Sequence, residues 1–226
     1  MKKTVMIGMP CYSTKVHIQT MRSLMADTIM LMSKGYQVMV AEDIGNSDIA
    51  ASRAAIVATF YRSTADILVF IDDDVFWESG TLVKLVEHPV DLVGGIYPKK
   101  KDDLEWPLRM DVKESYEADP ATGLMEVAGL PGGFMKITRH CVEKMIKAYP
   151  KETSRSGHES TQFWPLFDPL DIPGDRLSED FSFCQRWRDL GEKVWADFEM
   201  QMGHIGYKSY EGHMGNYLRS LENNVK

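Results

Sequence analysis

The sequence predicts one α/β domain with a mostly parallel central sheet flanked by helices. Strand-like and helix-like segments alternate over roughly the first 75 residues, and this order is typical of a parallel sheet with right-handed crossovers. At 226 residues and 25.7 kDa, the chain is long enough to bury a substantial core without disulfides. We therefore expect residues 1–226 to form a single domain.

Apolar runs predict the first three strands, and helical spacing predicts the two segments between them. Seven residues of the first helix share one stripe: Ile18, Met21, Leu24, Met25, Thr28, Ile29 and Met32. Lys34 and Gly35 follow as a helix stop, and Gly45, Asn46 and Ser47 form a turn and cap before the second helix. The expected elements are strands at 5–9, 36–41 and 67–71 and helices at roughly 18–32 and 48–62.

The later part of the chain predicts a less regular arrangement. We expect helices at 82–86, 139–148 and 178–190, and strands at 92–97 and 193–197. Residues 125–135 are strand-like but broken by glycine and proline. The charged segment 98–122 suggests a hairpin or a mobile loop, and residues 154–160 suggest a polar loop.

Composition excludes several classes of function. The net charge of -7 and a pI near 5.4 make nucleic acid an unsuitable partner, and the one basic run, Lys99 to Lys101, is followed at once by two aspartates. The three cysteines form no Cys-x-x-Cys pair, which argues against a disulfide framework or a zinc site. No stretch approaches the roughly 18 apolar residues of a membrane span. We therefore expect a cytoplasmic protein without a membrane span.

Polar and acidic residues follow each of the first three predicted strands. Pro10 and Tyr12 follow the first strand, Glu42 and Asp43 the second, and the run Asp72, Asp73, Asp74 the third. In parallel sheets ligands bind at the carboxyl ends of the strands. We expect these three loops to meet at one edge of the sheet.

Three consecutive carboxylates at the end of an apolar strand predict a cation site. Their mutual repulsion is costly unless a positive charge lies nearby. In an extended segment Asp72 and Asp74 share one face and Asp73 points to the other, so two of the three can bind one divalent ion. The alternative is a solvated acidic turn before the helix that begins near Ser79.

Arg53 lies on the apolar stripe of the second predicted helix, together with Ile49, Ile56, Val57 and Phe60. A buried arginine requires an anionic partner. That partner can be the acidic run or a ligand phosphate, and the two are not exclusive.

Three later features can join the same site. Glu179 and Asp180 open a helix, where the helix dipole favours acids, and a carboxylate there can also act as a general base. His204 lies between glycines after the last predicted strand, and His213 competes with it as a ligand. The loop around Gly132 and Gly133 can expose N–H groups to a sugar or phosphate, or form a bulge.

Taken together, these features resemble the GT-A fold glycosyltransferases, close to the family 2 type. The resemblance consists of the parallel start, the Asp-x-Asp motif at Asp72 and Asp74, the glycine-rich loop, the Glu-Asp pair and the final histidine, and it covers about residues 4–206. It implies a Rossmann-like half that binds a nucleotide sugar, residues 1–97, and a mixed half that binds the acceptor, residues 98–226.

The resemblance also implies roles for individual residues. A Mn2+ or Mg2+ ion would be bound by Asp74 and His204, with Asp72 as a further ligand near the ribose. Asp180 would be the base that deprotonates an acceptor hydroxyl. We further assign Asp73 to the donor site, as the counter-charge of Arg53. The remaining donor-site residues that it implies are Pro10, Tyr12, Glu42, Asp43, Arg53, Gly132, Gly133 and Glu179.

We therefore expect a metal-dependent glycosyltransferase of the hexosyltransferase type, which moves one sugar from a nucleotide sugar to a carbohydrate or glycoconjugate acceptor. UDP is favoured over GDP because UDP donors are common in similar enzymes. The chain lacks the Gln-x-x-Arg-Trp motif of processive synthases, which favours one sugar per event. The resemblance favours inversion, although retaining enzymes share the fold. A sugar-nucleotide nucleotidyltransferase and an inactive nucleotide- or carbohydrate-binding module are the alternatives, and the oligomeric state stays open.

Overall fold

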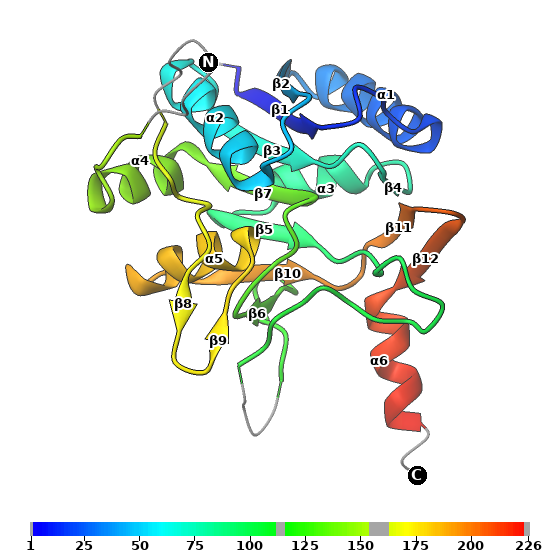
Figure 1. Ribbon diagram of the computed structural model, residues 1–226. Helices are drawn as coiled ribbons and strands as arrows, with labels where there is room; N and C mark the ends of the chain where they lie inside the picture. The colour runs from blue at the N-terminus through cyan, green and yellow to red at the C-terminus, as the bar shows by residue number, and fades with distance from the viewer. Residues whose placement is uncertain (1, 112–115, 154–162, 224–226) are drawn as a thin grey trace.

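A seven-stranded mixed sheet forms the centre of the molecule (Figure 1). The computed structural model describes residues 2–111, 116–153 and 163–223. The strands of this sheet are β1 (Thr4–Cys11), β2 (Gln37–Ile44), β3 (Ile67–Ile71), β5 (Leu92–Gly95), β6 (Met125–Val127), β7 (Phe134–Thr138) and β10 (Val194–Asp197). Their order is β2-β1-β3-β7-β5-β10-β6. All except β7 and β6 run in the same direction, which confirms the predicted fold class.

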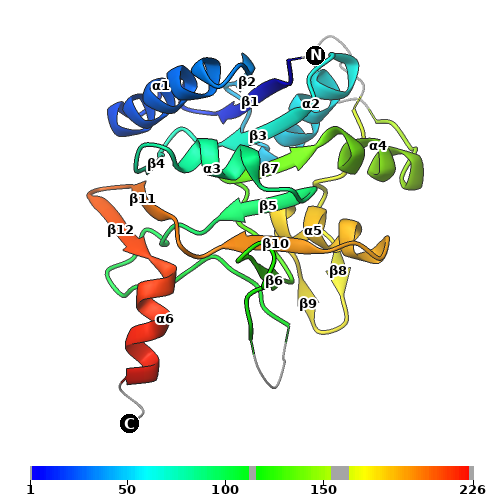
Figure 2. The same ribbon diagram turned by 180° about the vertical axis from the view of Figure 1, so that it is seen from behind.

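Helices cover both faces of this sheet (Figures 1 and 2). The helices are α1 (Ile18–Ser33), α2 (Ile49–Arg62), α3 (Thr81–Glu87), α4 (Arg139–Ala148), α5 (Glu179–Asp189) and α6 (Met214–Asn223). Side chains of α2, α4 and α5 share one buried apolar cluster, and side chains of α1 and α3 belong to a second cluster on the other face. Among the described residues, no helix combines the length and the apolarity that crossing a membrane requires.

The predicted elements of the first half are confirmed. β1 pairs in parallel with both β2 and β3, with Val5 opposite Val38 on one side and Ile67 on the other. The cap of α2 is Asp48 and not, as predicted, the turn Gly45 to Ser47; the side chain of Asp48 accepts a hydrogen bond from the N–H of Ala51 at 3.1 Å. Because β2 and β3 both flank β1, the loops that follow the three strands emerge at one edge of the sheet.

Several other elements were not predicted. A second sheet has the order β12-β11-β4 and consists of β4 (Val75–Trp77), β11 (Gln201–Ile205) and β12 (Ser209–His213). A short hairpin joins β8 (Asp171–Ile172) to β9 (Asp175–Arg176). The interrupted strand predicted at 125–135 is two strands, β6 and β7. Segments 98–111 and 116–122 hold no helix or strand, and the polar loop predicted at 154–160 lies outside the described residues.

The inner face of α1 is unexpectedly polar. Thr20, Ser23 and Asp27 are buried, whereas most of the apolar stripe recognised in the sequence is exposed. The carboxylate of Asp27 accepts hydrogen bonds from the indole Nε1 of Trp77 at 2.9 Å, the N–H of Gly80 at 2.7 Å and the N–H of Leu82 at 2.9 Å. Hydrogen bonds therefore hold α1 against β4 and the start of α3.

We expect Asp27→Ala to lower the free energy of unfolding by about 3 kcal/mol or more, because it leaves three donors without their acceptor in a buried position. Urea denaturation followed by circular dichroism measures this change. Arg22→Ala, at an exposed position on the same helix, is the control and should stay within about 0.5 kcal/mol of wild type. A small effect of Asp27→Ala would show that water replaces the carboxylate.

Candidate active site

A cleft of about 450 Å³ lies at the carboxyl ends of the first three strands. The residues that line it are Pro10, Tyr12, Ser13, His17, Asn46, Ser47, Ile49, Asp72, Asp73 and Asp74. The loops that follow β1, β2 and β3 all contribute, as expected from the sequence. Glu42 and Asp43 are not among the lining residues, and Asp43 instead accepts a hydrogen bond from Nδ2 of Asn46 at 2.7 Å. Tyr12 is 67% exposed, and its ring is open to stacking.

The three aspartates form a turn, and their side chains have three different sets of partners. The N–H of Val75 donates to the carbonyl of Asp72 at 3.3 Å, which reverses the chain from β3 into β4. The expectation of an extended segment, with Asp72 and Asp74 on one face, was therefore wrong. Each carboxylate meets a different part of the fold.

Asp72 binds Arg53, which projects from the buried side of α2. The guanidinium donates to Oδ1 of Asp72 at 2.9 Å and to the carbonyl of Gly132 at 3.0 Å, and its Nε lies 3.6 Å from Oε1 of Glu179. The side chain is only 3% exposed. Burial would lower the pKa of Arg53, but Asp72 and Glu179 raise it above its usual value. The predicted anionic partner is thus confirmed, although it is Asp72 and not Asp73.

Residues 132 and 133, which we call the glycine loop, must be glycines because they pack closely against Arg53 and Asp72. A Cβ on Gly132 would lie 2.8 Å from Cζ of Arg53, and one on Gly133 would lie 2.5 Å from Oδ2 of Asp72. The N–H of Gly132 donates to Oδ2 of Asp180 at 3.2 Å, and the N–H of Gly133 donates to the hydroxyl of Tyr97 at 3.0 Å. The two N–H groups are bonded within the protein, which favours a structural role for this loop over direct donation to a ligand.

The first turn of α5 adds two carboxylates beside Arg53. Asp180 accepts from the N–H of Gly132 and from the hydroxyl of Ser178. Burial raises the pKa of Glu179, and the neighbouring Asp180 raises it further, against the opposing effect of Arg53. The structure therefore brings Asp72, Glu179 and Asp180 together around one guanidinium.

Asp74 lies beside His204 and Lys100. The two atoms Nε2 of His204 and Oδ1 of Asp74 are 3.2 Å apart, and Nζ of Lys100 donates to Oδ2 of the same carboxylate. Burial would raise the pKa of Asp74, but hydrogen bonds from His204 and Lys100 outweigh it and hold that pKa below its ordinary value. His204 lies within β11 and not after the last strand, so its predicted placement was wrong. The competing His213 pairs with Glu199 at 3.6 Å.

The chemistry of this pair fits a divalent cation. Nδ1 of His204 lies 3.1 Å from the carbonyl of Pro98 and can only donate to it. Nε2 therefore faces Asp74 either with a proton, as a hydrogen-bond donor, or with a lone pair that can bind a cation together with the carboxylate. The described residues contain no group of three or more His, Cys, Asp or Glu side chains arranged as a metal site. A cation bound by Asp74 and His204 would take its other ligands from water or substrate.

Asp73 faces the loop after β1. It accepts from the hydroxyl of Ser13 at 3.2 Å and from Sγ of Cys11 at 3.4 Å, and its backbone carbonyl accepts from the N–H of His17 at 2.9 Å. Burial raises the pKa of Asp73 despite the hydrogen bond from Cys11. Its expected role as counter-charge of Arg53 was wrong; it connects β3 to the start of α1.

Sequence reasoning missed several residues of this site, among them Ser13, His17, Asn46, Ser47 and Ile49 of the cleft lining, and Tyr97 and Lys100. Tyr97 ends a predicted strand with no polar motif around it, yet its hydroxyl binds the glycine loop and its ring meets His204 edge to face at a centroid distance of 5.0 Å. Lys100 was recognised only as part of a charged run. No local pattern connects it to Asp74, because the contact spans 26 positions along the chain.

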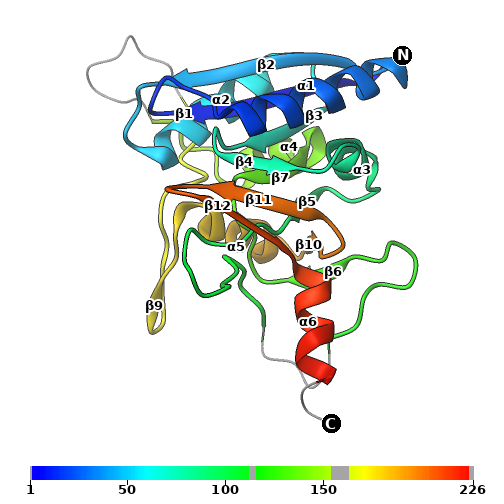
Figure 3. The ribbon, with the colours of Figure 1, turned by 90° about the vertical axis from the view of Figure 1, so that its right-hand side faces the viewer.

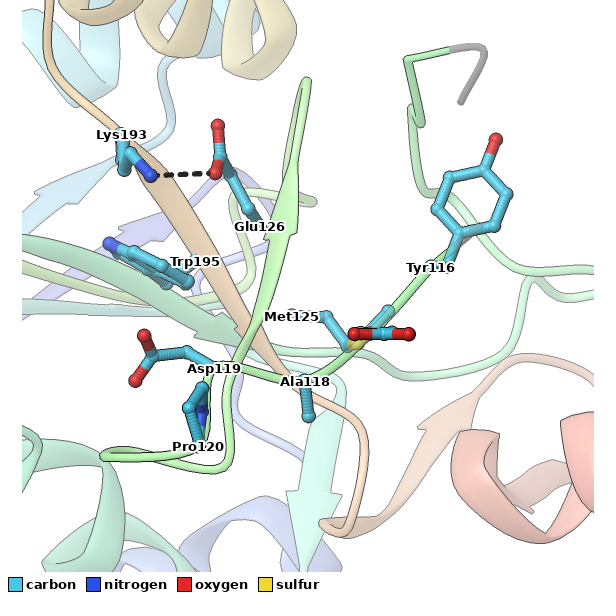
Figure 4. A pocket seen from close by; sticks show the side chains of 9 residues that line it. Tyr116, Ala118, Asp119, Pro120, Met125, Glu126, Lys193 and Trp195 are labelled. Carbon is cyan, nitrogen blue, oxygen red and sulfur yellow. Dashed lines mark hydrogen bonds and ion pairs between the residues drawn. The ribbon is translucent and has the colours of Figure 1, made fainter. Parts of the chain in front are cut away.

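A second hollow, of about 310 Å³, lies near the opposite end of the sheet, beside β6 and β10 (Figure 4). Trp195 and Met125 form its apolar side, and Lys193 pairs with Glu126 at 2.9 Å next to them. It shares no lining residue with the cleft at the aspartates. We therefore treat the two as separate features.

No protein-family model matches the sequence, and curated proteins give no match either. Among solved structures, A197 from STIV is 16% identical, with 91% of this chain and 86% of that chain covered and a TM-score of 0.52. GalNAc-T7 with UDP, GalNAc and Mn2+ is 13% identical, with 98% and 48% covered and a TM-score of 0.49, so this chain spans about half of it. A 4-diphosphocytidyl-2C-methyl-D-erythritolsynthase from Anaerococcus prevotii is 12% identical, with 96% and 99% covered and a TM-score of 0.45.

At these identities the comparisons concern the fold alone. The structures that resemble this chain include glycosyltransferases and nucleotide-using transferases of other kinds. They do not separate the two activities, and the exact family stays open.

We expect Glu179→Gln to be more stable than wild type at neutral pH, with the difference disappearing at low pH. In the folded protein the pKa of Glu179 is raised above its ordinary value of 4.5. The carboxyl therefore stabilises the folded state only while it is protonated, and this stabilisation is lost as the pH rises through the pKa that the group has in the folded protein. Urea denaturation of both proteins at pH values from 4 to 7.5 measures it. A variant that is less stable at pH 7 would mean that attraction to Arg53 outweighs burial.

Proposed function

We propose that the chain is a metal-dependent glycosyltransferase that moves one sugar from a nucleotide sugar to an acceptor hydroxyl. The observation that carries this proposal is the excess of carboxylates at the site. Asp72, Glu179 and Asp180 surround the single guanidinium of Arg53, and Asp74 stands beside them at the cleft. Because its carboxylates outnumber its cations, such a site can bind a cation and an uncharged hydroxyl group.

The cleft beside the aspartates is the proposed donor site. Tyr12 offers an exposed ring to a nucleotide base, and Asn46 and Ser47 offer polar groups to a ribose. Asp74 and His204 would hold Mn2+ or Mg2+, which neutralises the charge that develops on a departing diphosphate. In the structure Lys100 donates to the carboxylate of Asp74. When a cation binds, Lys100 would either be displaced from this carboxylate or form an ion pair with the diphosphate beside it. UDP is the favoured nucleotide.

Asp180 is the proposed general base. It is held by the N–H of Gly132 and the hydroxyl of Ser178, so its carboxylate is fixed relative to the glycine loop and to Asp72. A carboxylate that takes the proton of an acceptor hydroxyl while the diphosphate leaves from the other side gives inversion in a single displacement. The acceptor would be a carbohydrate or glycoconjugate that enters from the side of residues 98–226. Cytoplasmic localisation stays part of this proposal.

The acidity of the site disfavours the nucleotidyltransferase alternative. In that reaction the nucleophile is a phosphate of the sugar, which is already ionised and needs no base. Bringing it next to Asp72, Glu179 and Asp180 would be opposed by like charges, whereas a hydroxyl meets no such barrier. An inactive binding module would need neither a fixed base nor a paired metal ligand.

We expect one nucleoside diphosphate to raise the melting temperature only when Mn2+ is present. A ligand that binds only the folded state stabilises it in proportion to the logarithm of its concentration over Kd. UDP, GDP, CDP and dTDP, each with and without Mn2+, are compared by thermal shift. Asp74→Asn should lose the metal-dependent part of the shift. If no diphosphate shifts wild type with Mn2+ present, the donor site is wrong.

We expect Asp180→Asn to bind the nucleotide normally and to lose transfer by a factor of about 10² to 10⁴, the usual contribution of a general base. Release of nucleoside diphosphate from the donor, with a panel of saccharide acceptors, measures transfer. Asp189→Asn, at the other end of α5, is the control and should keep full activity. Release of pyrophosphate from a nucleoside triphosphate and a sugar phosphate would establish the nucleotidyltransferase instead.

A further inference from the structure

An extended apolar surface lies far from the active-site residues of α5, on α1 and the neighbouring strand β2. We call it the α1–β2 surface. Its side chains are 38% to 66% exposed, although a monomer normally scatters such residues singly. The residues are Ile18, Met21, Met25, Ile29 and Met32 of α1 and Val40 and Ile44 of β2.

The helix part and the strand part of this surface adjoin each other. Val40 pairs with Ile7 of β1, and Ile7 belongs to the same core cluster as Leu31 on the inner side of α1. Val40 therefore points to the face of the sheet that α1 covers. On the other flank of α1, the sulfur of Met30 lies 3.5 Å from the hydroxyl of Ser79, so the exposed stripe borders β2. Figure 3 shows α1 beside β2 at one end of the molecule.

The spacing of the stripe on α1 is symmetric about Met25. Met21 and Ile29 lie four positions before and after it, and Ile18 and Met32 lie seven positions before and after it. When two copies of this helix pack antiparallel, Met25 meets Met25, Met21 meets Ile29, and Ile18 meets Met32. A surface that complements itself in this way is what a two-fold symmetric interface requires.

The free edge of β2 also favours a second copy of this chain as the partner. β2 is the end strand of the seven-stranded sheet, and its outer side has no partner strand in the described part of the chain. Long apolar edges of this kind are normally covered, because they offer free N–H and carbonyl groups to another strand. An apolar partner without such groups, a lipid surface included, leaves them unpaired.

The charges on β2 favour antiparallel pairing with a second copy. With Val40 on the two-fold axis, Glu42 lies opposite Val38, and Asp43 lies opposite Gln37. Parallel pairing would instead align each carboxylate with its own copy, which is destabilising. The same two-fold axis places both α1 helices side by side on one face of the joined sheets.

We propose that this chain forms a symmetric dimer through the α1–β2 surface, with antiparallel pairing of β2 and antiparallel packing of α1. Seven apolar side chains exposed by 38% to 66% supply an area of the order of the roughly 800 Å² per partner that a standard interface buries. The dimer is independent of the proposed activity. The cleft at the aspartates shares no lining residue with the α1–β2 surface, so the dimer does not use the residues of the cleft.

Sedimentation velocity of the full chain at about 50 µM, with dilution to about 1 µM, tests the dimer. We expect wild type to sediment as a dimer and Met25→Glu to sediment as a monomer, because the two new carboxylates would meet at the symmetry axis. Leu221→Glu replaces an exposed apolar side chain of α6 and should stay dimeric. A monomeric wild type, or a Met25→Glu variant that stays dimeric, overturns the proposal.

A crosslinking variant makes the test independent of the stability of Met25→Glu. Met25→Cys should be joined to its own copy by a short bis-maleimide, and Leu221→Cys should not, while the native cysteines are buried. Equal crosslinking of both variants contradicts the geometry. The other possible occupant of the surface is lipid. If wild type is monomeric and floats with phosphatidylglycerol vesicles in a density gradient, and the Met25→Glu variant does not, then the surface binds lipid and the dimer is wrong.

Discussion

The ion pair between Arg53 and Asp72 is the interaction on which the candidate site depends. A guanidinium with 3% of its surface exposed needs a nearby anion to compensate its charge, and removal of one partner of such a pair typically costs about 3–5 kcal/mol. Arg53 lies on α2, and its partners come from three other parts of the chain: the end of β3, the glycine loop before β7, and α5. Arg53 therefore fixes the positions of Asp72, Gly132 and Glu179 relative to one another before any substrate binds.

The site is acidic overall because three carboxylates surround one guanidinium. Glu179 and Asp180 occupy the first turn of α5, where the helix dipole favours negative charge, and this placement partly offsets their repulsion. The remaining repulsion appears in the raised pKa of Glu179. On the cleft side Asp74 is compensated by His204 and Lys100. An ordered array of carboxylates with few cations is preorganised to receive positive charge, and this property distinguishes it from an anion-binding site.

The sequence predicted those features that depend on local pattern. The apolar run at 67–71, the helix at 139–148 and the order of the first five elements need only periodicity and caps, and all of them are confirmed. Strands of two or three residues, such as β4 and β8, contain too few positions for any period. The partner of Arg53 could be predicted as acidic, but the choice of Asp72 over Asp73 depends on the turn that Val75 closes. The roles proposed for Asp74, His204 and Asp180 await their tests.

Helix α1 shows the clearest limit of periodicity. The pattern identifies an amphipathic helix but not the face that is buried, because the partners of its polar face, Trp77, Gly80 and Leu82, lie about fifty positions further along the chain. These partners belong to the segment that directly follows the aspartate turn, and the N–H of His17 binds Asp73 within that turn. Helix α1 is thus attached by hydrogen bonds to both ends of the segment 73–82. Its outer face is free for another copy of the chain because polar contacts with this segment, and not its apolar stripe, hold it on the fold.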